Sequence, residues 1–325
     1  MSPFLIDGPN VECTDTTSLD TVIGRLFSQN VYVREIYPLE GHLHTMCLLI
    51  LSNKEQLLLK GTPRAMTPLL RQEKRLLDTE ARAMSILKRS TAPCIPSLLH
   101  YDRRGDLFGS SFILRPFISG TTAQELERQI SEHAQKHVDY ALGSLAHEIS
   151  QHASPSFGSL EQVASGSGKR SWREAFLVLF EGILRDSEDF FVNLPYAEIR
   201  HQLYRLSPAL EEVRQARLVV VNLGRPSQVL LDPESKRLVG VVDLSSALWG
   251  DAYMAEIFDN PSSSVLDGFG IRPTKSKPES IRHLLYGCYR SITKITVQYF
   301  RDRNITAEND ARRRLTKILT DMAVY

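Results

Sequence analysis

Hydrophobic residues change their spacing along the chain, and this change predicts a strand-rich first part followed by a mainly helical second part. Residues 16–28 place apolar side chains on one side of a short helical repeat, and residues 68–88 continue the same pattern over a longer segment. Between them, the apolar runs 47–51 and 57–59 flank a polar turn, which predicts a β-hairpin. A further apolar run, Ser111–Phe117, indicates a buried strand.

Helical spacing dominates the chain after Thr121. Helical patterns cover most of residues 122–152, 171–214, 279–303 and 307–323. A hairpin over 229–243 interrupts them, and the Pro-, Gly- and Ser-containing segment 260–278 predicts an exposed loop. We therefore expect an α+β protein with two lobes, a small antiparallel-sheet N-lobe and a larger, mainly helical C-lobe. The expected division is 1–30 for an N-terminal extension with a short helix, 31–118 for the N-lobe and 119–325 for the C-lobe.

Composition narrows the classes of function. The chain has 325 residues and a formal net charge of +1, so bulk charge favours neither nucleic acid nor an anionic membrane as a partner. No apolar run approaches the roughly 20 residues that a membrane helix needs. The scattered cysteines form no metal-type or disulfide-type pattern, and the first residues do not resemble a secretory signal. These features predict a soluble, cytoplasmic protein.

Two charged residues interrupt the apolar pattern of the first part. Lys60 ends the apolar strand 56–60, and Glu80 shares a helical face with the neighbouring apolar side chains Leu77, Ala81, Met84 and Leu87. A carboxylate that faces a core is costly unless it is paired, which makes Lys60 the natural partner of Glu80. Glu73 lies two turns earlier on the same face and is the rival for that pairing.

The segment Leu218–Asp251 contains a strand, a short loop, a hairpin and a lone carboxylate, Asp243, followed by Gly250-Asp251. Together with Lys60, Glu80 and the run SFILRPFISGTT (111–122), it resembles the aminoglycoside phosphotransferase and choline kinase type of small-molecule kinase. The resemblance extends from about Val31 to Phe258. The segment Trp172–Phe176 (WREAF) is similar to one found in fungal members.

The resemblance implies a bilobal protein-kinase-like fold with ATP and Mg²⁺ as candidate cofactors. In such a lobe, Lys60 contacts the nucleotide phosphates and Glu80 holds Lys60 in place. Asp243 and Gln228 match the two magnesium-binding positions. The segment 111–122 matches the hinge that crosses between the lobes over the adenine.

The catalytic loop departs from the family pattern, which is His-Gly-Asp-x-x-x-x-Asn. The corresponding residues are Val221-Asn222-Leu223, with Gln228 at the last position. Leu223 therefore stands at the catalytic-base position, and a leucine side chain can neither orient nor deprotonate a hydroxyl group. No catalytic residue is assigned, and whether the protein is an enzyme stays open.

Three hypotheses follow. The first is a kinase-fold protein of small-molecule, natural-product metabolism whose phosphotransfer is lost or replaced, as a pseudokinase or an enzyme with a repurposed pocket. In that case His42, His44 and Arg225 are candidate pocket groups beside Asp243. The second is an active ATP-dependent phosphotransferase that acts on an alcohol group of a small molecule. The third is a non-catalytic binding module that engages a protein partner.

Overall fold

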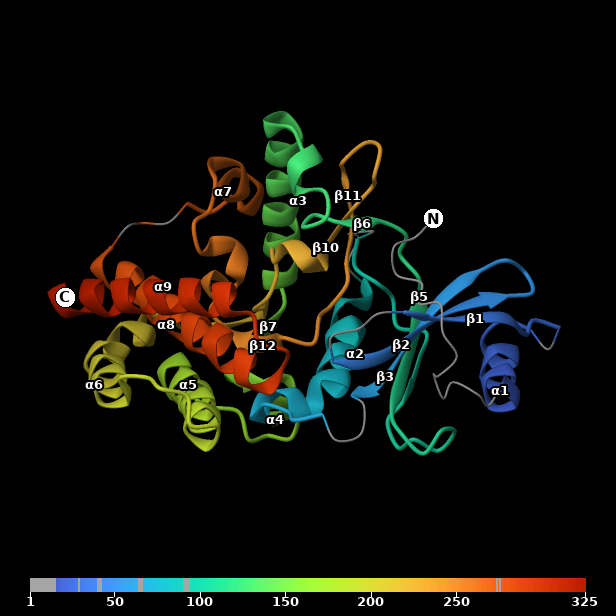
Figure 1. Ribbon diagram of the computed structural model, residues 1–325, viewed down its shortest axis with the longest axis horizontal. Helices are drawn as coiled ribbons and strands as arrows, with labels where there is room; N and C mark the ends of the chain where they lie inside the picture. The colour runs from blue at the N-terminus through green and yellow to red at the C-terminus, as the bar shows by residue number, and fades with distance from the viewer. Residues whose placement is uncertain are drawn as a thin grey trace.

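The structure is a computed structural model that describes residues 16–28, 30–39, 43–63, 67–89, 94–272, 274 and 276–325. Of the candidate site residues, His42 lies outside the described residues. Figure 1 shows a sheet-containing lobe on the right and a cluster of helices on the left, with the C-terminus among the helices.

A single antiparallel sheet forms the centre of the N-lobe. Its strands run in the order β1–β2–β3–β5–β4. Their bounds are β1 (Val33–Leu39), β2 (His44–Leu51), β3 (Gln56–Pro63), β4 (His100–Asp102) and β5 (Phe112–Pro116). The predicted hairpin is β2 and β3, joined by a tight turn in which Lys54 takes a φ of 72°. The predicted strand within 111–117 is β5, which pairs with β3.

Each face of this sheet packs on a different helix, because successive side chains of a strand point to opposite faces. Leu57 and Leu59 of β3 pack in an apolar cluster with the helix α1 (Thr16–Leu26). Lys60 lies on the other face, toward the helix α2 (Leu76–Ile86), which short 3₁₀ turns precede and follow. The predicted helices 16–28 and 68–88 are therefore present, and the second has 3₁₀ turns at both ends.

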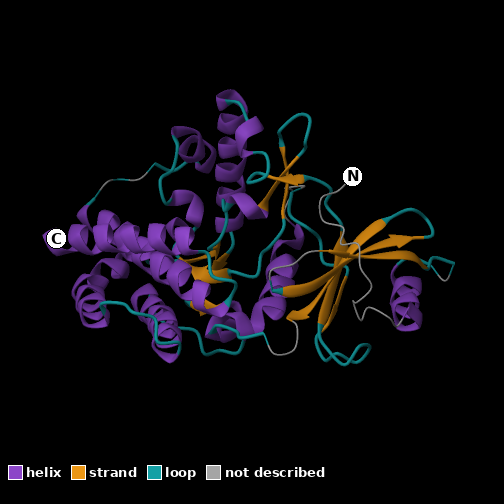
Figure 2. Cartoon of the chain, in the orientation of Figure 1, coloured by secondary structure: helices purple, strands orange, loops and turns teal. Residues whose placement is uncertain are grey.

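Helices make up most of the C-lobe, as Figure 2 shows. They are α3 (Glu132–Ser150), α4 (Leu160–Ala164), α5 (Trp172–Asp189), α6 (Tyr196–Leu206), α7 (Ser263–Phe269), α8 (Lys277–Phe300) and α9 (Ile305–Val324). Two small sheets lie among them, in the orders β11–β10–β6 and β7–β9–β12–β8. Their strands are β6 (Thr121–Thr122), β7 (Ala153–Ser154), β8 (Gly158–Ser159), β9 (Ala216–Val220), β10 (Val229–Leu231), β11 (Leu238–Val241) and β12 (Ala247–Gly250).

The expectation of an exposed loop over 260–278 is wrong for its first half, which contains α7. Val265 and Phe269 of α7 are buried against α3. The two helices approach so closely that a Cβ atom at Gly143 of α3 would clash with the carbonyl oxygen of Val265. Gly268 is in the same position against α3, at the carbonyl oxygen of Tyr140. Short helices of this kind form through packing, which a local pattern rich in Pro, Gly and Ser does not reveal.

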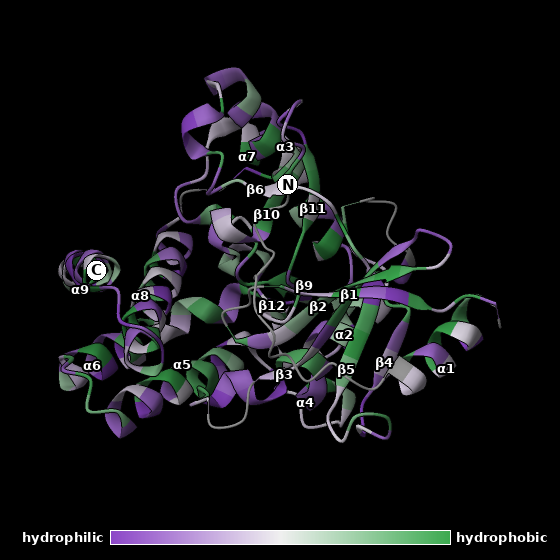
Figure 3. Ribbon diagram, turned by 45° about the vertical axis from the view of Figure 1, so that its right-hand side comes forward, coloured by the Kyte–Doolittle hydropathy of each residue, from purple (hydrophilic) through white to green (hydrophobic). Residues whose placement is uncertain are grey.

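The main core fills the C-lobe and continues beneath α2 into the N-lobe. Figure 3 shows apolar colouring on the central N-lobe strands, whereas α5 and α6 display polar and apolar residues along the same helix. Within the described residues, no helix is long and apolar enough to span a membrane. The described cysteines, Cys47, Cys94 and Cys288, are buried and form no disulfide with one another.

Candidate functional site between the lobes

Lys60 and Glu80 form the ion pair that the sequence predicted. The Lys60 Nζ atom donates to Glu80 Oε2 at 2.6 Å, and Glu80 is 0% exposed. Glu73, the rival, instead pairs with Arg301 at 2.6 Å and accepts a hydrogen bond from the Leu70 backbone N–H. Glu80, and not Glu73, is therefore the partner of Lys60, because Glu80 lies on the face of α2 that is directed toward the Lys60 side of the sheet. Their role toward a nucleotide stays a prediction.

Asp243 completes this group from the C-lobe. Its Oδ1 lies 3.6 Å from Lys60 Nζ and accepts a hydrogen bond from the Ser245 backbone N–H at 2.8 Å. Its Oδ2 lies 3.5 Å from the amide nitrogen of Gln228. The fold thus brings Lys60 to Asp243 and Gln228, which lie more than a hundred residues further along the chain.

Burial and charge act against each other on these groups. Burial alone would lower the pKa of the Lys60 ammonium, but the carboxylates of Asp243 and Glu80 outweigh it and raise that pKa. Burial likewise opposes ionisation of Asp243, but Lys60 and the hydrogen bonds of Ser245 hold its pKa below the ordinary value. For Glu80, burial dominates over the attraction of Lys60 and raises the pKa. Lys60 and Asp243 are therefore charged at neutral pH.

Arg115 is a further buried charge at this site that the sequence reasoning did not single out. It is 3% exposed, and its guanidinium donates to the carbonyl oxygens of Pro116 at 3.3 Å and Val242 at 3.2 Å. Burial lowers its pKa, whereas the nearby charges of Glu80 and Asp243 raise it. A signal existed in the sequence, because an arginine inside the apolar strand 112–116 needs buried partners.

The segment 221–223 buries Leu223 in the main core. Leu223 is 3% exposed and packs in the main core, whereas Asn222 is partly exposed. The Asn222 N–H donates to Ser246 Oγ at 3.0 Å, and the Leu223 carbonyl accepts from the Ile257 N–H at 2.9 Å. The loop is thus fixed with an amide, not a carboxylate, at its partly exposed position.

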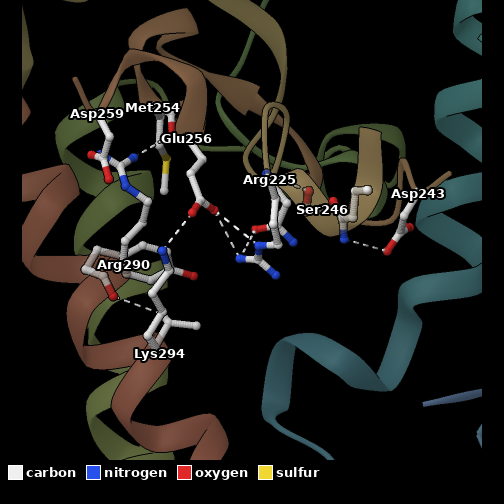
Figure 4. A network of polar contacts seen from close by, with 12 residues as sticks. Arg225, Asp243, Ser246, Met254, Glu256, Asp259, Arg290 and Lys294 are labelled. Carbon is white, nitrogen blue, oxygen red and sulfur yellow. Dashed lines mark hydrogen bonds and ion pairs between the residues drawn. The ribbon is translucent and has the colours of Figure 1, made fainter. Parts of the chain in front are cut away.

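The Arg225 side chain also fixes this loop. Its Nη2 atom donates to Asn222 Oδ1 at 3.0 Å and pairs with Glu256 Oε2 at 3.2 Å. Glu256 also pairs with Lys294 of α8 at 2.7 Å, and Figure 4 shows Glu256 lying between the two cations. Burial opposes ionisation of Glu256, but Arg225 and Lys294 outweigh it and lower the pKa of that carboxyl group. Arg225 therefore orients Asn222 in this structure.

His44 lies beside Lys60 at the start of β2. Its Nδ1 atom is 2.9 Å from the Gly61 carbonyl oxygen, and its buried Nε2 atom has no hydrogen-bond partner among the described residues. Burial and the charge of Lys60 lower the pKa of this imidazole to about 4, so it is neutral at pH 7. A cavity of about 280 Å³ borders His44, together with Thr62, Leu77 and Tyr101. Lys60 and Asp243 do not line that cavity.

Asp251 has a structural role in the C-lobe core. Its Oδ2 accepts a hydrogen bond from the Tyr286 hydroxyl at 2.7 Å and lies 3.2 Å from Arg282 Nε. The Tyr286 oxygen in turn accepts from Trp172 Nε1 at 2.8 Å. A Cβ atom at the adjacent Gly250 would clash with the ring of Trp172. The segments 172–176 and 250–251 are therefore coupled by packing.

Without a phosphate ligand, the described polar groups make a poor magnesium site, because they supply one carboxylate, Asp243, and one amide, Gln228. Both oxygens of Asp243 already accept hydrogen bonds, from the Ser245 backbone N–H and the Gln228 amide. Two cations and two carboxylates, Lys60, Arg115, Glu80 and Asp243, leave no net negative charge to attract a divalent ion.

Comparison with protein-family models gives no match, and no curated protein sequence matches the chain. Solved structures match over almost its whole length. The aminoglycoside phosphotransferase APH(4)-Ia covers 94% of this chain and 98% of its own, with a TM-score of 0.62 and 19% identity. A protein of Ralstonia eutropha JMP134, provisionally assigned to the same enzymes, covers 94% of this chain and 96% of its own, with a TM-score of 0.63 and 11% identity.

The fold is that of aminoglycoside phosphotransferases. A third neighbour, APH(2")-IIa in a ternary complex with streptomycin and ATP, covers 96% of this chain and 99% of its own, with a TM-score of 0.58 and 14% identity. The two-lobed α+β kinase-like fold expected from the sequence is thus confirmed. At these identities the likeness establishes the fold alone, because one fold supports many functions.

Proposed function

We propose that this kinase-fold protein binds a nucleotide or a related phosphorylated small molecule between its lobes, and that ordinary phosphotransfer is lost or replaced. The loop observation carries the proposal: Leu223 is 3% exposed in the core, and the partly exposed Asn222 is an amide. A general base contributes typically about 10²–10⁴-fold to rate, so its loss predicts very slow transfer to a hydroxyl group.

Binding itself is supported by the groups that remain. Lys60 supplies an ammonium held by Glu80 and Asp243. Structural neighbours are described in complexes with ATP, with AMP-PNP and hygromycin B, and with ADP and hygromycin B. A role in natural-product metabolism, which the resemblance to fungal members implies, belongs to the same proposal.

Thermal stabilisation tests the binding proposal, because a ligand that binds only the folded state raises its stability by mass action. We expect ATP or ADP to raise the melting temperature of the wild-type protein and to have little effect on Lys60→Met. The matched control is Lys136→Met, which removes an exposed lysine of α3 in the C-lobe whose ion pair among the described residues is with Glu132. Equal responses of wild type and Lys60→Met would refute the assignment of the site.

The second candidate is an active phosphotransferase, and the intact group of Lys60, Glu80 and Asp243 favours it. Transfer of a labelled γ-phosphate to a hydroxyl-bearing small molecule distinguishes the two candidates. Our proposal predicts transfer at least about a hundredfold slower than the 1–100 s⁻¹ that is typical of kinases. We expect Asn222→Asp, which places a carboxylate at the partly exposed loop position, to show more transfer than the wild type. Rapid transfer by the wild type would establish the second candidate.

A further inference from the structure

Arg115 enters the site from the same sheet face as Lys60. In the antiparallel pairing of β3 with β5, Lys60 lies opposite Ile113 and Leu58 lies opposite Arg115. Paired residues share a face and successive residues alternate, so Lys60 and Arg115 are diagonal neighbours, and such neighbours are about 7–8 Å apart at Cα. Arg115 therefore directs its side chain toward α2 and the space between the lobes, not toward α1.

Arg115 is a buried cation, and not all of its N–H donors have a hydrogen-bond partner. Its guanidinium makes two hydrogen bonds of 3.2 and 3.3 Å, both to carbonyl oxygens, and one of these belongs to Val242, next to Asp243. The Nε–H has no partner among the described residues, although the side chain is almost fully buried. Glu80 Oε1 is likewise without a hydrogen-bond partner there. A guanidinium stays protonated in proteins, so this charge is permanent.

Charge balance distinguishes this site from a metal-dependent phosphotransferase site. In those enzymes, metal ions held by carboxylate and amide groups neutralise the charge of the phosphates. In this protein, Lys60 and Arg115 already balance Glu80 and Asp243, and Leu223 replaces a further carboxylate. The two carboxylates are thus already compensated, whereas the Nε–H of Arg115 is a buried donor without a partner among the described residues and can serve an added anion.

The role of Arg115 rests on the proposed binding of phosphate groups between the lobes. We infer that Arg115 provides the positive charge that a divalent cation provides elsewhere, so that the phosphate groups of a nucleotide bind here without metal. Arg115 acts with Lys60 as a fixed pair of cations. Asp243, whose oxygens accept from Ser245 and Gln228 and face Lys60, holds the lysine and not an ion.

Titration calorimetry of the full chain with ATP tests the inference, once in excess EDTA and once in excess Mg²⁺. We expect the Kd of the wild type to agree within about twofold between the two conditions. Arg115→Met should weaken binding in EDTA by at least about tenfold, which is the effect of one lost charge-assisted hydrogen bond. Mg²⁺ should restore part of that loss, whereas Arg115→Lys, which retains the charge, should stay close to the wild type.

Arg34→Met is the matched control, because Arg34 lies on the same sheet but has a side chain that is 65% exposed, and its ion pair among the described residues is with its neighbour Glu35. A second measurement does not need a nucleotide: electron paramagnetic resonance of added Mn²⁺ should detect no more binding to the wild type than to Arg34→Met, and tighter binding to Arg115→Met. If Arg115→Met does not fold, this measurement still tests the inference on the wild type and Arg34→Met, because tight binding of Mn²⁺ by the wild type would contradict it.

The possible outcomes separate the two proposals. ATP binding by the wild type only when Mg²⁺ is present, or tight binding of Mn²⁺ by the wild type, would overturn the role of Arg115 while leaving nucleotide binding intact. Equal affinity of wild type and Arg115→Met in EDTA would overturn it as well. No binding of ATP in either condition would overturn the proposed function, and the metal-free phosphate site with it.

Discussion

Removal of Lys60 and removal of Glu80 should have unequal effects on stability, although the two residues form one pair. Lys60→Met leaves Glu80 with 0% exposure and no ammonium beside it. Glu80→Gln leaves Lys60 with a second carboxylate, since Asp243 Oδ1 lies 3.6 Å from its Nζ. The asymmetry follows from the third charge, which a simple buried ion pair lacks.

The magnitudes follow from the burial of each group. Breaking a buried ion pair by removing one partner costs about 3–5 kcal/mol, and we expect Lys60→Met at neutral pH to fall in this range. Loss of one hydrogen bond to a charged group costs about 1.5–3 kcal/mol, which applies to Glu80→Gln. The double variant Lys60→Met/Glu80→Gln leaves no uncompensated charge on α2. Its cost should be smaller than the sum of the single costs by about 2 kcal/mol, within the range of coupling between contacting residues.

The pH dependence of Lys60→Met provides a second test. The folded-state pKa of Glu80 is already raised by burial, and the loss of Lys60 raises it further. The folded variant then binds a proton that the unfolded chain releases, so its stability falls as the pH increases through that range. We expect Lys60→Met to be more strongly destabilised at pH 8 than at pH 5.

Urea unfolding followed by circular dichroism, together with calorimetry, gives these free energies. Tryptophan fluorescence alone is unsuitable, because the two tryptophans, Trp172 and Trp249, are both buried in the C-lobe core. Additive costs of the two single variants would refute the reasoning. So would equal destabilisation by each, since this would mean that Asp243 does not support Lys60 in the folded protein.

Three more predictions concern other parts of the site. The pKa of His44 falls from 6.5 to about 4 on folding, so the folded state resists protonation, and stability should decrease by up to about 3 kcal/mol as the pH falls from 6.5 to 4. Unfolding measured over that range should show a flatter profile in His44→Gln. Leu223→Asp buries a carboxylate in the core and should cost at least about 3 kcal/mol in a urea melt, without a gain of phosphotransfer; activity comparable to that of a kinase would contradict the placement of Leu223. Glu256→Gln weakens its pairs with Arg225 and Lys294, and hydrogen exchange of residues 221–228 should become faster, with no change expected in β1.

Much of the fold was readable from local pattern. Apolar runs in β2 and β3, separated by a polar turn, and the helical repeat of α2 identified the N-lobe elements, and the long amphipathic helices α8 and α9 were equally clear. The short helix α7 was missed because its stability comes from contact with α3, where Gly143 and Gly268 permit close approach. Strands of two residues, such as β6 and β7, also carry no local signal, because they exist only through their partners.

The positions of charged residues within apolar patterns show which charges must find a partner. A glutamate on the apolar face of a helix and a lysine at the end of an apolar strand predicted the pair of Lys60 and Glu80. Arg115, an arginine inside an apolar strand, gave the same kind of signal, which was not used. The balance of these charges follows from the folded arrangement and not from local pattern, because electrostatic energy depends on distance and burial. It also decided the state of the loop, since packing alone sends Leu223 into the core and leaves Asn222 at the partly exposed position.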